Sequence, residues 1–177
     1  VRNGVRSGLS DIFATRLRSG EAPIALAATE YTEVAPVLSP DGRWLAYASH
    51  ETGQEEVFVV AFPNAADSKW SISPNGGTEP VWSPSSKELF YRDLRGVLRS
   101  VAVETDPMFS PGPATALFDS RAYVMSGLHP SYQVAPDGQR FLMIRRVTER
   151  SRGDVTVVEN WLEELDPDAA DRAGAGS

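Results

Sequence analysis

The stretch A-P-V-L-S-P-D-G-R-W-L-A-Y, residues 35–47, occurs three times in this chain in related form. The second copy is E-P-V-W-S-P-S-S-K-E-L-F-Y at residues 79–91, and the third is S-Y-Q-V-A-P-D-G-Q-R-F-L-M at residues 131–143. No gap is needed to superimpose them. Self-similarity at a fixed period predicts that the chain is built from copies of one small structural unit.

Each copy is predicted to form a strand, a turn and a second strand. In Ser39-Pro40-Asp41-Gly42, proline fixes φ, aspartate bonds its own backbone, and glycine accepts the left-handed conformation of a tight hairpin. The second copy has Ser85-Ser86 in place of Asp-Gly, so we expect a looser turn there. The residues that define the repeat are Ser39, Pro40, Asp41, Gly42, Trp44, Tyr47, Trp82, Ser83, Pro84, Phe90, Tyr91, Pro136, Asp137, Gly138 and Phe141.

The period of the repeat predicts the fold class. The equivalent prolines of the three copies, Pro40, Pro84 and Pro136, are 44 and 52 residues apart. The strand after each turn carries apolar residues on both of its faces. A strand-filled period of this length is typical of propeller blades, whose sheets stack on neighbours on both sides. We therefore expect an all-β fold, a partial β-propeller of about three to four four-stranded antiparallel blades, with almost no helix.

The same pattern predicts how the chain is divided. The last strands of one blade are expected at residues 9–28, and further blades at residues 31–74, 77–120 and 128–162, all within a propeller segment 1–165. The acidic stretch 166–177 has no apolar anchors and is predicted to be a disordered tail.

A partial ring leaves the face of its first blade without a neighbour. We place the apolar residues Ile12, Phe13 and Ile24 on that face. Its exposure would be costly, so we expect the chain to be a fragment of a six- to eight-bladed ring that upstream blades complete.

Composition narrows the possible functions. There is no cysteine, which excludes disulfides and thiolate zinc sites, and the net charge of −7 argues against nucleic acid as a partner. The longest apolar run, residues 57–62, is too short to span a membrane.

No motif in the chain predicts catalysis, a cofactor or a metal site. The two histidines, His50 and His129, are isolated and expected in surface loops. Asp41 and Asp137 are explained by their turns. The tail 166–171 lacks the central glycine and the closing glutamate of a calcium loop. We therefore predict a non-catalytic module.

Two further groups of residues have a structural and a functional interpretation. Trp44 and Trp82 lie inside the repeat and are expected to pack between sheets rather than to stack on a ligand; the same expectation is weaker for Trp70 and Trp161. The stretch 145–152 carries four arginines, which suit either an exposed hairpin connection or contact with an acidic partner.

The pattern S-P-D-G-x-W-L-A-Y, followed by E-V-F-V-V-A-F-P at residues 56–63, resembles the TolB-type, WD-like β-propeller repeat. Its order with W-S-I-S-P-N-G-G-T-E-P-V-W (70–82), Y-Q-V-A-P-D-G-Q-R-F-L-M-I (132–144) and V-T-V-V-E-N-W-L-E-E-L (155–165) is more specific. It is similar to the C-terminal end of the propeller appended to membrane-bound bacterial serine/threonine protein kinases. The resemblance covers residues 9 to about 165.

This resemblance implies a bacterial module that binds a protein, a peptide or a small ligand at the mouth of the propeller channel, beside the remaining blades of its parent chain. In the kinase subtype it would be the extracytoplasmic sensor of a transmembrane kinase whose catalytic domain lies outside this chain. Two alternatives stay open: a free-standing periplasmic TolB-like scaffold, and the propeller of a prolyl-oligopeptidase-type serine hydrolase. A periplasmic or extracytoplasmic location follows from the resemblance alone.

Overall fold

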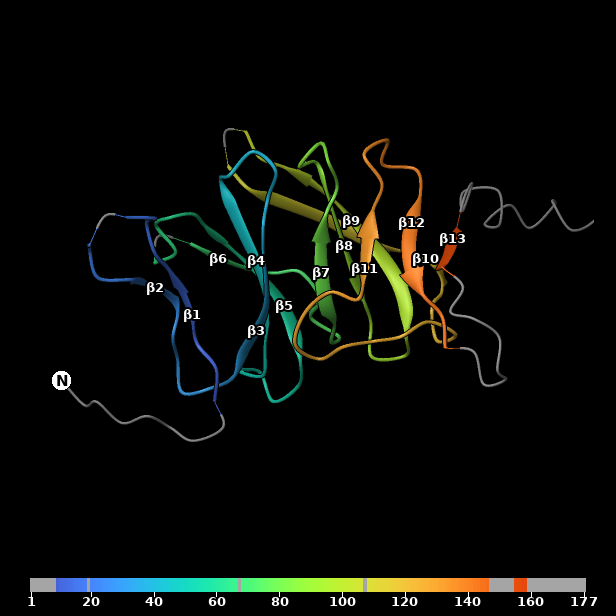
Figure 1. The fold of residues 1–177 in the computed structure, drawn as a ribbon, viewed down its shortest axis with the longest axis horizontal. Helices are drawn as coiled ribbons and strands as arrows, with labels where there is room; N and C mark the ends of the chain where they lie inside the picture. Colours follow the sequence, from blue (N-terminus) through green and yellow to red (C-terminus); the bar gives the residue numbers. More distant parts are fainter. Residues whose placement is uncertain (1–8, 19, 67, 107, 147–154, 159–177) are drawn as a thin grey trace, which may run out of the picture.

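The computed structural model describes residues 9–18, 20–66, 68–106, 108–146 and 155–158. All helical or extended elements within these residues are β-strands; there is no helix among them. The strands form four antiparallel sheets (Figure 1). The prediction of an all-β fold is confirmed.

The strands follow the chain order within each sheet. The first sheet pairs β1 (Ile12–Ala14) with β2 (Ile24–Ala27). The second contains β3 (Glu33–Leu38), β4 (Trp44–Ser49), β5 (Glu56–Ala61) and β6 (Lys69–Ser71). The third contains β7 (Thr78–Trp82), β8 (Glu88–Arg92), β9 (Val97–Glu104) and β10 (Ser110–Asp119), and the fourth contains β11 (Tyr132–Val134), β12 (Phe141–Ile144) and β13 (Val155–Val158).

The first strands of the last three sheets lie next to one another. Strand β3 contacts β7, and β7 contacts β11, whereas β6 and β10 lie at the opposite edges of their sheets. The sheets therefore stand side by side like the blades of a propeller (Figure 1). The fold is a partial β-propeller.

The repeats form equivalent corners between the first and second strands of each sheet. The N–H of Gly42 donates to the carbonyl of Ser39 at 2.8 Å, and the N–H of Gly138 donates to the carbonyl of Ala135 at 2.8 Å. Both glycines have a φ of 72°. Only a residue without a side chain adopts this conformation at no steric cost, which explains the Asp-Gly pair in two of the repeats.

The expected looser turn in the second repeat is wrong. Ser86 adopts a φ of 60°, and its N–H donates to the carbonyl of Ser83 at 3.0 Å. Its hydroxyl also accepts a hydrogen bond from the N–H of Asp41 at 3.1 Å, so neighbouring corners touch. This contact offsets part of the steric cost of a left-handed serine.

Aromatic side chains fill the space between the β3–β6 and β7–β10 sheets. Trp44 and Trp82 are buried, as expected. Phe109 joins them, with its ring centroid 5.0 Å from that of Trp44 and 4.9 Å from that of Trp70. Trp70 therefore also belongs to the packing between sheets.

The two end faces of the stack are partly apolar and exposed. Phe13 is 55% exposed and Ile24 49%, and at the other end Leu142 is 42% exposed and Ile144 59%. The expectation that Ile12 lies on the open face is wrong: it is only 7% exposed and belongs to the core formed with the second sheet. Phe13 is exposed although it follows Ile12 directly, and the pairing of β1 with β2 is irregular between these two residues.

Several predicted features lie outside the described residues: Trp161, the arginine-rich stretch from 147 to 152, and the tail 166–177. Within the described part of the chain, no helix is long and apolar enough to cross a membrane.

Candidate functional site

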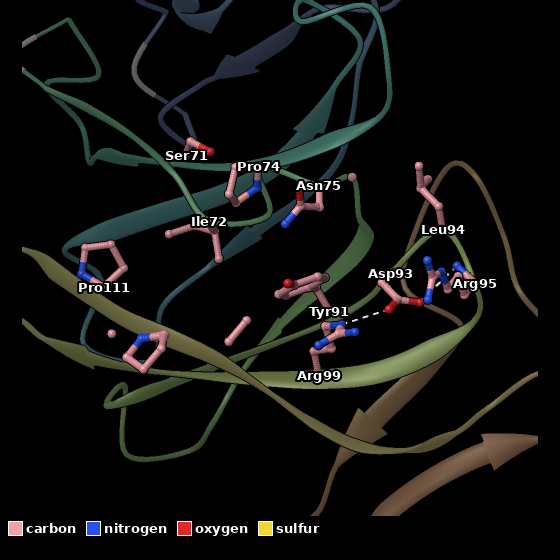
Figure 2. A pocket seen from close by; sticks show the side chains of 14 residues that line it. Ser71, Ile72, Pro74, Asn75, Tyr91, Asp93, Leu94, Arg95, Arg99 and Pro111 are labelled. Atoms are coloured by element: carbon pink, nitrogen blue, oxygen red, sulfur yellow. Dashed lines mark hydrogen bonds and ion pairs between the residues drawn. The ribbon is translucent and has the colours of Figure 1, made fainter.

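A groove of about 780 Å³ lies between the β3–β6 and β7–β10 sheets (Figure 2). Three segments line it: the end of β6 with the connection that follows, the turn between β8 and β9 with its flanking residues, and the start of β10. Both sheets are complete four-stranded units. The geometry of the groove is therefore set by the described blades themselves.

Apolar and rigid groups make up much of the wall. Ile72 and Tyr91 line it with buried side chains, and Pro74 and Pro111 line it from the connection after β6 and from β10 (Figure 2). A Cβ on Gly77 would lie 2.6 Å from the ring of Tyr91, so only glycine lets the connection after β6 pass this close to the sheet.

Asp93 organises the charged part of the groove. Its carboxylate accepts hydrogen bonds from the N–H groups of Arg95 and Val97, both at 2.9 Å, and from Nε of Arg99 at 2.8 Å. Burial by itself would raise the pKa of Asp93, but these hydrogen bonds and the charge of Arg99 hold that pKa below its usual 3.8. Asp93 is therefore ionised near neutral pH and holds Arg99 in place.

The two arginines keep unused hydrogen-bond donors. Arg99 uses only Nε for Asp93, and its two terminal nitrogens have no hydrogen-bond partner among the described residues; the same holds for the whole guanidinium group of Arg95. Guanidinium donors of this kind match the oxygens of a carboxylate or a phosphate. The groove thus combines an apolar wall with free positive donors.

The connection between β10 and β11 runs past the first strands of the neighbouring sheets, β3 and β7 (Figure 1). The carbonyl of Leu128 accepts a hydrogen bond from the N–H of Ala35 at 3.1 Å. Glu79 accepts from the N–H of Ser126 at 2.6 Å and from the hydroxyl of Ser131 at 2.8 Å. This connection therefore ties the ends of β3 and β7 together.

Glu79 and Arg92 form a buried ion pair behind this connection. Their side chains are 0% and 1% exposed, and Oε2 of Glu79 lies 3.1 Å from Nε of Arg92. The side-chain Nε–H group of Arg92 is not aligned for a hydrogen bond with Glu79, so the contact between the two side chains is electrostatic. The hydroxyl of Tyr132 donates to the main-chain carbonyl of Glu79 at 2.9 Å, and burial raises the pKa of Tyr132 well above the usual value. We interpret this cluster as structural.

Of the repeat-defining residues, only Tyr91 lines the groove. The three corners, at Pro40, Pro84 and Pro136, form turns at the far ends of the inner strands, away from the connection at Ala35 and Glu79. These residues build the blades.

The histidines lie in loops, as expected. His50 is exposed, and Nδ1 of His129 lies 3.0 Å from the hydroxyl of Ser126. Among the described residues no carboxylate hydrogen-bonds to either ring, and no three His, Asp or Glu side chains gather as metal ligands.

Asp93, Arg95 and Arg99 are not among the residues that the sequence singles out. A local signal for them exists: Asp93-Leu94-Arg95-Gly96 is a turn sequence in which aspartate bonds the backbone, and Arg99 lies on the strand that follows. Their position facing Ile72 and Pro74 requires the packing of two sheets and has no local signal.

The architecture defines the chain as part of a β-propeller, and comparison with known proteins agrees. No protein-family profile matches it. An uncharacterized protein of Agrobacterium fabrum is 28% identical over 147 residues, which are 80% of this chain and 49% of that protein.

The structural neighbours include TolB. A TolB-type protein of Agrobacterium tumefaciens has a TM-score of 0.56 and 20% identity, over 86% of this chain and 53% of its own. A prolyl endopeptidase has a TM-score of 0.53 and 15% identity, over 80% of this chain and 23% of its own. Oligogalacturonate lyase of Vibrio parahaemolyticus has a TM-score of 0.51 and 13% identity, over 77% and 37%. At these identities the likeness concerns the fold, and the chain spans about half the length of the first relatives.

Proposed function

We propose that this chain is a recognition module of a β-propeller protein and that it binds a partner in the groove between the β3–β6 and β7–β10 sheets. The observation that carries the proposal is the state of Arg99. Asp93 fixes the Nε of Arg99 at 2.8 Å, while the terminal nitrogens of Arg99 have no hydrogen-bond partner in the part of the chain that the structure describes. Concave sites that combine apolar side chains with fixed polar groups are typical of binding sites.

We further propose that the parent protein is a bacterial transmembrane serine/threonine kinase and that this propeller is its extracytoplasmic sensor. The support is the order of the repeat sequences, which resembles the C-terminal propeller of such kinases. The whole parent would combine these blades with others that cover the exposed end faces around Phe13 and Ile144.

Two other parents have support of their own. The likeness to a TolB-type structure favours a periplasmic scaffold, and the likeness to a prolyl endopeptidase favours the propeller of a serine hydrolase. The reading frame around this chain separates the three. H-R-D and D-F-G motifs before a hydrophobic twenty-residue segment indicate the kinase, a signal peptide with blades alone indicates the scaffold, and a G-x-S-x-G hydrolase domain indicates the third.

Binding at the groove is tested in the parent protein with a photo-crosslinking amino acid. Leu94, which lines the groove and is 57% exposed, is the test position, and Leu17, 84% exposed and outside the groove, is the control. We expect a defined adduct from position 94 that Arg99→Gln abolishes. The same adduct from position 17, or none from position 94, would refute binding at the groove.

A further inference from the structure

We propose that the partner held in the groove is an extended acidic peptide segment, with a carboxylate on Arg99 and Arg95 and apolar side chains against Pro74 and Pro111. This inference rests on the proposed function, since it names the ligand class of the same groove.

The groove is net positive because two guanidinium groups, those of Arg95 and Arg99, line it together with one carboxylate, that of Asp93. Asp93 accepts two main-chain N–H groups and Nε of Arg99. With three donors bound, Asp93 positions Arg99 and does not compete with a ligand for the terminal nitrogens. Arg95 is exposed and adds a second guanidinium at the same end of the groove (Figure 2). Paired planar donors favour a carboxylate, which accepts two parallel hydrogen bonds.

The field around the groove makes this positive site selective. The chain as a whole has a net charge of −7, whereas the groove is lined by Arg95 and Arg99 against Asp93 alone. An acidic segment is therefore repelled by the chain overall and attracted at this position. Complementarity of this kind contributes mainly to specificity and to the rate of association.

The walls favour a peptide that binds through its side chains. Pro111 and Pro113, on the outer strand β10, have no N–H group, and the pairing of β10 with β9 is irregular between Pro111 and Ala114. A peptide cannot extend the sheet with a regular hydrogen-bond ladder at such an edge. The rigid proline rings and the exposed Leu94 instead offer an apolar surface. The groove volume of about 780 Å³ is within the usual range for ligand sites, about 300–1,000 Å³.

The test measures binding of two fluorescein-labelled octapeptides to the parent protein by anisotropy. One alternates leucine and glutamate, and the other alternates leucine and glutamine. We expect the glutamate peptide to bind at least about tenfold more tightly, as one charge-assisted hydrogen bond implies, and its affinity to fall with added salt. Arg95→Gln and Arg99→Gln should each remove most of this difference. Arg95 is exposed, so its replacement leaves the fold intact even if Arg99→Gln does not.

The matched control is Lys87→Gln, an exposed cation in the turn before β8 and outside the groove, which should leave binding unchanged. Equal binding of the two peptides, or a loss with Lys87→Gln equal to that with Arg95→Gln, overturns the inference. If removal of residues 166–177 strengthens binding of the glutamate peptide, the chain's own acidic tail is the occupant and the partner inference is wrong. If neither peptide binds while position 94 still forms its adduct, the inference of an acidic ligand is wrong and the proposed function stands. If neither peptide binds and position 94 forms no adduct, both the inference and the proposed function are wrong.

Discussion

Arg92 and Glu79 face each other at 3.1 Å with both side chains removed from solvent. Removing one partner leaves a buried charge without compensation, which costs about 3–5 kcal/mol. We expect Glu79→Ala to lower the free energy of unfolding in urea by about this amount. The double variant Glu79→Leu with Arg92→Met should recover part of the loss, because it buries no charge but leaves the N–H of Ser126 without its acceptor. A double variant as unstable as the single one would contradict this.

The left-handed glycines at the corners are the second target. Gly42→Ala and Gly138→Ala place a Cβ at a φ of 72° with open space around it, so the cost is conformational. Each should destabilise by about 1–2 kcal/mol in urea unfolding. Gly127→Ala is the matched control, since its Cβ meets nothing and its φ lies outside the left-handed region. Equal effects at all three positions would refute the role of the corners.

Phe109 holds three tryptophans together: its centroid lies 5.0 Å from Trp44, 4.9 Å from Trp70 and 6.3 Å from Trp82. Phe109→Ala should cost about 3–5 kcal/mol and shift tryptophan fluorescence to longer wavelength, because a buried cavity opens beside the rings. The adjacent Met108 is 74% exposed, and Met108→Ala should change stability by less than about 0.5 kcal/mol. An unchanged emission maximum in the Phe109 variant would argue against this cluster.

The ionised Asp93 should make the groove sensitive to acid. Its pKa in the folded protein is below the usual 3.8, so the stabilisation it provides is fully present above that value and is lost as the pH falls through the lower, folded-state pKa. Relative to Asp93→Asn, the wild type should therefore keep a constant stability advantage between about pH 5 and 7 and lose it below about pH 4. Urea unfolding across this range measures it; an advantage that grows in acid would contradict the sign.

The exposed end faces predict self-association of the isolated chain. Phe13 and Ile24 at one end, and Leu142 and Ile144 at the other, are apolar and 42–59% exposed. We expect dimers or larger species in light scattering. Serine at all four positions should restore the monomer, whereas Met108→Ser, also exposed but away from both faces, should not. A stable wild-type monomer would contradict the prediction.

The repeat shows which segments of the chain resemble one another. Because these segments recur with the period of propeller blades, the repeat also predicts the fold. The corners are short-range features, since Pro40, Asp41 and Gly42 act on their own backbone. The same local chemistry gave a wrong prediction at Ser86, where a looser turn was expected. A left-handed turn forms there without glycine, and the N–H of Asp41 in the neighbouring corner donates a hydrogen bond to the Ser86 hydroxyl. The placement of Ile12 on the exposed end face was also wrong, because an apolar pattern alone does not tell which face of a strand is buried.

From its sequence alone this chain is a series of strands and tight turns with a period of blades, because turn chemistry and apolar alternation act between residues close in the chain. Only the tertiary structure decided that the end of β6, Asp93 to Arg99 and Pro111 to Ala114 share one groove, and that the connection after β10 closes over Glu79. These segments are tens of residues apart, and their meeting depends on how whole sheets pack against each other, which no local pattern encodes.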